Sequence, residues 1–170
     1  QRKRPEETDL WTSLPDHAKQ AGVILIQYSG NMGLWHNIDD LVEAASALKD
    51  LPFHFVMIGE GRRRAPAQAR ATELQLENMS WLPFQPLSRL TDSLQCAHLS
   101  LVSQRNEVVG IMVPCKLYGI LASGRAVVAI APQDSEVAFT LQEHDCGVLI
   151  DPKKPQLLVE TLKKLYFEDL

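Results

Sequence analysis

Short apolar runs recur along the chain, and the stretches between them carry apolar residues at helical spacing. Runs of four to eight residues rich in β-branched and aromatic side chains are typical of strands buried on both faces of a parallel sheet. Apolar positions three and four apart predict amphipathic helices between them. The apolar runs comprise residues 23–28, 53–58, 79–82, 98–102, 126–130 and 148–150.

The helical stretches carry residues that helix ends prefer. Asn37 is predicted to cap a helix with its side chain, and Pro114 suits the first turn of another that stops at Gly124. The expected helices comprise residues 38–48, 64–76, 87–94, 114–121, 137–141 and 155–165. Because parallel strands need crossover connections, this alternation predicts an α/β fold: a doubly wound, Rossmann-like parallel sheet of about six strands with helices on both faces.

Composition bounds the kind of protein. The 170 residues, 45% of them hydrophobic, suit a single globular domain. Residues 1–20 are predicted to be a linker or leading segment, with the domain over residues 21–170. Residues 1–7 are charged and aperiodic, and Trp11, Leu14 and Pro15 are expected to hold the later part of the segment to a surface. The chain starts without methionine, which leads us to expect a fragment or a processed product.

Charge and cysteine content narrow the partners and the compartment. A net charge of −4 argues against a nucleic-acid binder. No apolar run is long enough to span a bilayer. The three cysteines are widely spaced, which argues against a disulfide framework and favours a reducing, cytoplasmic compartment.

Ligands of doubly wound sheets bind at the carboxyl ends of the strands, so the loops there are the candidate site. Gly30 and Gly33 follow the first run and permit close approach to a phosphate, although an ordinary turn has the same residues. Arginines 62–64 follow the second run and either neutralise a diphosphate or form a solvated basic turn. Phe84 follows the third run, where backbone groups could contact the edge of a base.

Lys116 provides the most specific physical clue. It falls in the first turn of the helix expected from Pro114, where free N–H groups and the positive end of the helix dipole favour an anion. A lysine there is unfavourable unless an anion lies nearby. The alternative is a solvated surface lysine.

Several motifs are absent from the sequence. It has no Gly-x-Gly-x-x-Gly, which disfavours an NAD-dependent enzyme, and no P-loop or Gly-x-Ser-x-Gly elbow. It has no Asp-x-Asp pair, and its five histidines show no metal-ligand spacing. We therefore expect no metal and no cofactor.

Three segments together resemble a known family. Residues 28–33, with His36, are similar to the loop after the first strand of the C-terminal, donor-binding half of a GT-B glycosyltransferase of family 4 (glycosyl transferases group 1). Residues 55–61 are similar to its second strand and turn. Residues 113–127 resemble the signature helix in its Pro-Ser-Lys-Leu-Tyr variety. The resemblance covers roughly residues 22–152.

This resemblance implies the donor half of a retaining, metal-independent hexosyltransferase. It would move a sugar from a nucleoside diphosphate sugar, its co-substrate, to a glycan or lipid-linked acceptor. An absent N-terminal domain would hold the acceptor, and the full enzyme would associate peripherally with the inner face of the cytoplasmic membrane. The catalytic residues are unknown. The expected donor-binding residues are Gly30, Asn31, Met32, Gly33, His36, Arg62, Phe84, Glu107, Gly110, Ile111, Met112, Val113, Lys116 and Tyr118.

The chain departs from the family pattern at one pair of positions. The usual Glu-x7-Glu pair would fall at Ile111 and Gly119, where there is no carboxylate. The second glutamate commonly holds the donor ribose. A non-catalytic, Rossmann-like module that binds a nucleotide or a partner is therefore the alternative function.

Overall fold

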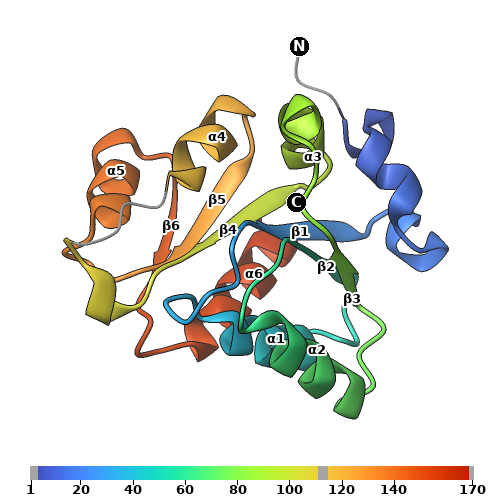
Figure 1. Ribbon diagram of the computed structural model, residues 1–170, viewed down its shortest axis with the longest axis horizontal. Coiled ribbons are helices and arrows are strands. Elements are labelled where there is room, and N and C mark those ends of the chain that lie inside the picture. Colours follow the sequence, from blue (N-terminus) through green and yellow to red (C-terminus); the bar gives the residue numbers. More distant parts are fainter. Residues whose placement is uncertain (1–3, 111–114, 169–170) are drawn as a thin grey trace.

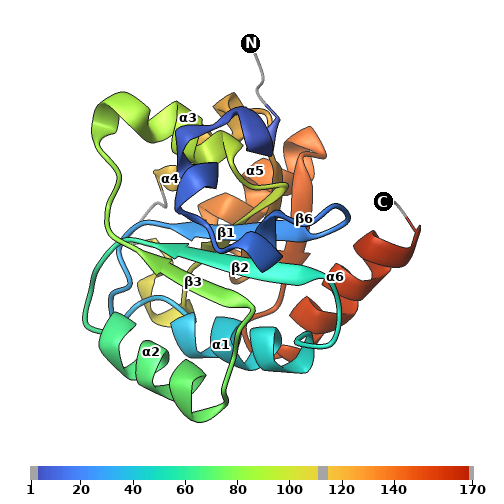
Figure 2. The same ribbon diagram turned by 90° about the vertical axis from the view of Figure 1, so that its right-hand side faces the viewer.

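The computed structural model describes residues 4–110 and 115–168. Six parallel strands form one sheet in the order β3-β2-β1-β4-β5-β6 (Figures 1 and 2). The predicted doubly wound α/β fold is confirmed. The strands are β1 (Ile24–Ser29), β2 (Phe53–Ile58), β3 (Met79–Leu82), β4 (Leu99–Ser103), β5 (Ala126–Ile130) and β6 (Gly147–Ile150).

Helices cover both faces of the sheet (Figure 1). One layer holds α1 (Ile38–Ala47), α2 (Arg64–Glu73) and α6 (Gln156–Glu168). The other layer holds α3 (Leu90–Gln95), α4 (Lys116–Ala122) and α5 (Glu136–His144). Two short 3-10 turns, η4 (Leu87–Arg89) and η5 (Asn106–Val108), lie in the loops after β3 and β4.

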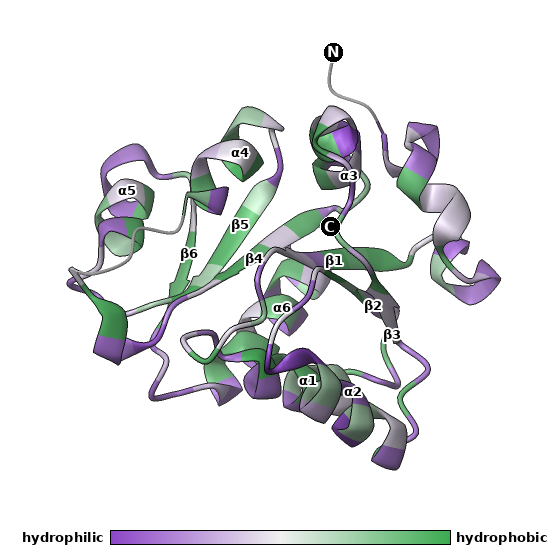
Figure 3. Ribbon diagram, in the orientation of Figure 1, coloured by the Kyte–Doolittle hydropathy of each residue, from purple (hydrophilic) through white to green (hydrophobic). Residues whose placement is uncertain are grey.

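The core lies between the sheet and these two layers. Residues of β1, β2, α1 and α6 form the largest apolar cluster, and β5 packs with α4 and α5 in a second. Figure 3 shows the strands hydrophobic along most of their length, while the helices and connections carry most of the hydrophilic residues. Each large aliphatic side chain buried in this way contributes about 1.5–3 kcal/mol relative to its exposed state, so the sheet is a firm platform for its loops.

The leading segment forms three 3-10 turns, η1 (Pro5–Glu7), η2 (Asp9–Ser13) and η3 (Asp16–Lys19). Leu10, Leu14 and Ala18 are buried in a third cluster with residues of β1 and β2. The turns cover the sheet on the same side as α3 (Figure 1). The domain boundary at residue 20 stays a prediction, although this packing ties the segment to the domain.

The structure bears on four predicted helix ends in different ways. Asn37 precedes α1, but its side chain forms no capping hydrogen bond; its backbone N–H donates to Ser103 Oγ over 2.7 Å. Helix α4 is described from Lys116 onward, and Pro114 lies outside the described residues. Helix α5 ends at Asp145, whose φ of 46° reverses the chain before Gly147. The predicted stop of α4 at Gly124 is confirmed by its φ of 70°.

Candidate functional site at the carboxyl edge of the sheet

The order of the strands reverses between β1 and β4, which are neighbours in the sheet although β2 and β3 separate them in the chain. Loops leaving two such strands diverge to opposite faces and leave a crevice, where doubly wound proteins bind ligands. Here β1 ends at Ser29 and β4 at Ser103. The loops over residues 30–37 and 104–110 therefore form the candidate site in the described part of the chain.

The loops after β1 and β2 are joined by their backbones. The N–H of Gly30 donates to the Ile58 carbonyl over 2.9 Å, and that of Met32 donates to the Glu60 carbonyl over 2.7 Å. Gly30 and Met32 are among the predicted donor-binding residues, but the fold already uses their backbone N–H groups, which are therefore not open to a phosphate. Among the described residues, the backbone N–H groups of Asn31 and Gly33 have no acceptor, so within residues 30–33 these two could still donate to a ligand.

Glycine is required where these loops meet. Gly59 has a φ of +125°, and a Cβ on it would lie 2.0 Å from the Gly30 carbonyl oxygen. Gly61 has a φ of +146°, and its Cβ would lie 2.5 Å from the Met32 carbonyl. Both the dihedral angle and the backbone contact exclude side chains here.

Met32 does not face the candidate site. Its side chain is completely buried in the main apolar cluster, with Tyr28 and Ile38. The Met32 side chain supports the loop from beneath and cannot contact a donor there, so the predicted role of Met32 in donor binding finds no support from its side chain. A methionine fills irregular core space of this kind readily.

Lys116 lies against the loop after β1. Its Nζ is 2.9 Å from Tyr28 Oη and 4.1 Å from the centre of the Tyr28 ring. A Cβ on Gly30 would lie 3.2 Å from the same nitrogen. Burial lowers the pKa of Lys116 to about 8. Within the described part of the chain, no carboxylate forms an ion pair with this lysine.

His36 fixes the loop to the neighbouring strand. Its Nδ1 donates to the Ser103 carbonyl over 2.9 Å, and the ring is almost completely buried. Burial, and then the charge of Lys116, lowers the pKa of His36. A neutral imidazole with Nδ1 protonated leaves Nε2 as an acceptor. His36 therefore helps to build the loop and does not add positive charge.

The three arginines after β2 have different roles. Arg63 pairs with Asp39 over 2.6 Å, and Arg64 binds the Glu60 carboxylate and the Gly59 carbonyl. Arg62 is exposed and forms no ion pair with any described residue. Whether any of the three arginines contacts a diphosphate stays a prediction.

Phe84 continues the candidate site past β2. Its side chain is about half exposed, and its Cε1 would lie 3.1 Å from a Cβ on Gly59. Since Gly59 also contacts Gly30, and Gly30 contacts Lys116, these four residues form one continuous edge. An exposed aromatic ring at its end offers a stacking surface for a planar group.

The remaining predicted residues follow β4. Glu107 is exposed and lines a cavity of about 210 Å³ with Asn37 and Arg105. Gly110 has a φ of +74°, and Tyr118 is about half exposed on α4. A Cβ on Gly119 would lie 3.6 Å from Leu94 of α3. The predicted contacts Ile111, Met112 and Val113 lie outside the described residues.

Sequence reasoning missed Tyr28, which it treated as the end of a strand. The phenol is completely buried, donates to the Asn31 carbonyl over 2.7 Å and accepts from Lys116. The available signal was a polar aromatic residue directly before a glycine-containing loop. A buried hydroxyl must find a hydrogen-bond partner, and the nearest backbone is that of the loop.

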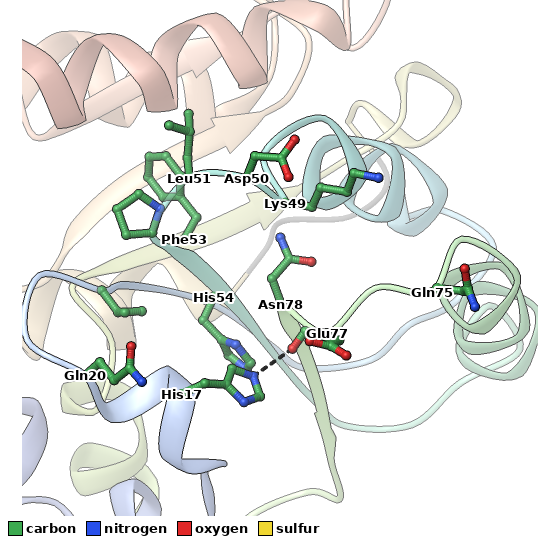
Figure 4. Close-up of a pocket in the computed structure, with 12 residues that line it drawn as sticks. His17, Gln20, Lys49, Asp50, Leu51, Phe53, His54, Gln75, Glu77 and Asn78 are labelled. Atoms are coloured by element: carbon green, nitrogen blue, oxygen red, sulfur yellow. Dashed lines mark hydrogen bonds between the residues drawn. The ribbon is translucent and has the colours of Figure 1, made fainter.

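A cavity of about 640 Å³ lies at the opposite edge of the sheet (Figure 4). Its polar groups bond mainly to the protein itself. His17 Nε2 is 2.8 Å from the Glu77 carbonyl, His54 Nε2 is 2.8 Å from Ser80 Oγ, and Asn78 Nδ2 donates to Ala45. The His17 bond holds the leading segment to the body of the domain, and the other two join β2 to β3 and Asn78 to α1. Because the cavity lies away from the carboxyl ends of the strands, where ligands of doubly wound sheets bind, we do not assign it to the candidate site.

In residues 4–110 and 115–168, no three histidine, cysteine, aspartate or glutamate side chains gather as metal ligands would. The expected independence of metal stays a prediction. None of the helices in the described part of the chain is long and apolar enough to span a bilayer.

Comparison with known proteins bears directly on this site. The family described as "Glycosyl transferases group 1" matches residues 11–169. The chain is 30% identical over 152 residues to WcaI of Escherichia coli (strain K12), named as a colanic acid biosynthesis glycosyl transferase. That match covers 89% of this chain and 36% of WcaI. The chain therefore spans about a third of the length of this relative.

Solved structures share the fold. WaaG, a glycosyltransferase involved in lipopolysaccharide biosynthesis, superposes with a TM-score of 0.70 at 19% identity, over 91% of this chain and 43% of WaaG. Anabaena HepE in complex with UDP and glucose gives a TM-score of 0.70 at 17% identity, over 91% and 44% of the two chains. Family match and shared fold together confirm the resemblance at the level of the family: the chain belongs to the glycosyl transferases group 1 and is a domain of the GT-B type.

Proposed function

We propose that the chain is the donor-binding half of a retaining, metal-independent glycosyltransferase of family 4, in the Pro-Ser-Lys-Leu-Tyr variety. It would bind a nucleoside diphosphate sugar at the carboxyl edge of the sheet. The observation that carries this proposal is the Lys116 ammonium group, which lies against Gly30 without a carboxylate partner among the described residues. A desolvated cation in such a crevice is suited to an anionic ligand.

In the proposed reaction, this half of the enzyme stabilises the charge that develops on the donor. As the bond between sugar and diphosphate breaks, negative charge grows on the leaving phosphate. Groups already in place lower the energy of that state most, because they need no reorganisation. Lys116, the Asn31 and Gly33 N–H groups and the exposed Arg62 would supply them.

The rest of the donor would extend to both sides of the diphosphate. We assign the base to the exposed face of Phe84, next to Gly59. The sugar would lie toward Glu107 and the cavity beside it. We propose that no carboxylate holds the ribose from position 119, because this residue is a glycine and a Cβ on it would lie 3.6 Å from Leu94 of α3.

We propose that the acceptor and the catalytic groups belong to an N-terminal domain outside this chain. The names of WcaI and WaaG, from colanic acid and lipopolysaccharide biosynthesis, support a glycan or lipid-linked acceptor. HepE crystallised with UDP and glucose, which supports a hexose donated from a nucleoside diphosphate. The whole enzyme would act in the cytoplasm, at the inner face of the membrane.

A non-catalytic nucleotide-binding module is the second candidate. One observation favours it: neither position of the family's glutamate pair, 111 or 119, carries a carboxylate. Transfer of sugar by the complete protein, measured with radiolabelled donors, distinguishes the two functions.

Donor binding is tested by calorimetry with UDP, GDP, ADP and NAD, with and without a chelator. We expect at least one nucleoside diphosphate to bind, NAD to give no signal, and the chelator to leave the affinity unchanged. Binding of NAD alone would refute the donor site, and a large loss on chelation would refute independence of metal.

A further inference from the structure

Tyr28 joins three parts of the candidate site through one oxygen atom. Its Oη donates to the Asn31 carbonyl over 2.7 Å and accepts from Lys116 Nζ over 2.9 Å. The hydroxyl therefore links the first residue of α4 to the loop after β1.

The direction of both hydrogen bonds is fixed. The Asn31 carbonyl and the Lys116 ammonium group allow only one arrangement, since the first can only accept and the second can only donate. Burial raises the pKa of Tyr28, which keeps the phenol protonated. Because the hydroxyl donates to Asn31, its oxygen becomes a better acceptor for the lysine.

The Tyr28 ring provides a second contact. The Lys116 nitrogen lies 4.1 Å from the ring centre, within the range of cation–π attraction. The ring itself is completely buried in the core. Tyr28 thus holds the ammonium group by its oxygen and by its ring, and the core holds Tyr28.

The chemical nature of this holder matters for an anion site. A carboxylate would hold the lysine more strongly, but it would also cancel the charge that a phosphate requires. A neutral phenol fixes the position and leaves the positive charge. An ammonium group has three donor hydrogens, and only one is used by Tyr28 within the described residues.

We propose that Tyr28 is a positioning residue for diphosphate binding, acting through Lys116 and through the Asn31 backbone. This inference rests on the proposed function, because it needs a diphosphate at Lys116. Tyr28 holds the ammonium group against Gly30, where burial lowers the lysine pKa and so disfavours the charged form.

The test compares Tyr28→Phe with Tyr166→Phe, a tyrosine of α6 whose ring packs on Phe53. Tyr28→Phe keeps the ring in the core and removes only the oxygen. Lysine titration is followed by NMR with labelled lysine, the Lys116 signal being assigned by its loss in Lys116→Ala. UDP affinity is measured by calorimetry at pH 6.5 and 8.5.

We expect the Lys116 pKa to fall by about one unit in Tyr28→Phe, which makes the charged fraction about tenfold smaller above that pKa. UDP affinity should then fall about tenfold at pH 8.5 and much less at pH 6.5. Tyr166→Phe should match the unaltered protein at both values. A loss of affinity that is equal at both pH values would indicate general damage to the fold and would overturn the inference.

The remaining outcomes separate this inference from the proposed function. If no nucleoside diphosphate binds the unaltered protein, the proposed function fails. If UDP binds and Lys116→Ala weakens it, but Tyr28→Phe changes neither the lysine titration nor the affinity, the inference alone fails. Should Tyr28→Phe not fold, labelled tyrosine in the unaltered protein decides: saturation with UDP must shift the Tyr28 ring signals and leave those of Tyr166 in place.

Discussion

At the scale of single residues, Lys116 stands in two unfavourable surroundings. Burial lowers its pKa to about 8, and it occupies the first position of α4, where the helix dipole is positive. Hydrogen bonding and cation–π contact with Tyr28 offset part of this cost. A bound diphosphate would remove most of the remainder.

Replacing Lys116 by alanine tests this balance. Affinity for UDP should fall by about 1.5–3 kcal/mol, the range for a hydrogen bond to a charged group. The free energy of unfolding without ligand should stay the same or rise slightly. Lys49→Ala, at the opposite edge of the sheet, is the matched control for calorimetry and urea unfolding. Equal UDP affinities in both variants would remove Lys116 from the site.

Residue chemistry predicted the charged groups better than the apolar ones. Lys116 and Arg62 were expected at the site from their type and position, and the structure leaves both without a carboxylate partner in its described part. Whether either contacts a donor stays a prediction. Met32 between Asn31 and Gly33 has the sequence pattern of an exposed loop, and only the packing of α1 beneath that loop buries it.

At the scale of elements, the strands were predictable because a strand covered on both faces is apolar throughout. Each of the six apolar runs became a strand with bounds shifted by at most about one residue.

The pairing of the loops after β1 and β2 was not predictable. Their hydrogen bonds join residues about 28 positions apart, and such contacts depend on strand order. The missing side-chain cap at Asn37 has the same cause, since Ser103 of β4 accepts from its backbone.

Gly59→Ala tests the contact between the loops after β1 and β2. The new Cβ would meet the Gly30 carbonyl at a positive φ, so we expect a loss of unfolding free energy of about 3 kcal/mol or more. UDP binding should be lost as well. Gly22→Ala is the control: its φ is +86°, but no atom lies within 4 Å of the new Cβ. For Gly22→Ala we expect a loss of unfolding free energy of about 1–2 kcal/mol, which is the cost of the positive φ alone. Equal losses by urea unfolding would show that the loop contact contributes nothing.

At the scale of the whole molecule, the leading segment is fastened to the sheet across the amino edge. His17 of η3 and His54 of β2 lie with ring centres 5.3 Å apart. His17 Nε2 donates to the carbonyl of Glu77, two residues before β3, and His54 Nε2 forms a hydrogen bond with Ser80 Oγ in β3. Burial, and then the charge of His17, lowers the pKa of His54 to about 4. The sequence placed His54 in a strand but gave no sign of its distant partner, because η3 and β2 meet only in the folded chain.

This pairing predicts acid sensitivity. His54 binds its proton near pH 4 when folded and near pH 6.5 when unfolded, so the unfolded state holds more protons between these values. Stability is therefore complete above about pH 6.5 and is lost as pH falls toward 4, by up to about 3 kcal/mol. Urea unfolding of the unaltered protein and of His54→Gln across this range measures the difference. If the free energy of unfolding falls equally with decreasing pH in both proteins, the assignment to His54 is wrong.

The joined loops also determine which amide hydrogens meet water. Gly30 and Met32 donate across to the loop after β2, whereas Asn31 and Gly33 have no acceptor in the described part of the chain. Amide exchange along these four residues of the free protein should therefore alternate, slow at Gly30 and Met32 and fast at Asn31 and Gly33. A diphosphate bound at this edge of the sheet would slow amide exchange only at Asn31 and Gly33. All four amides would then exchange slowly, so ligand binding would abolish the alternation without any ordering of the loop.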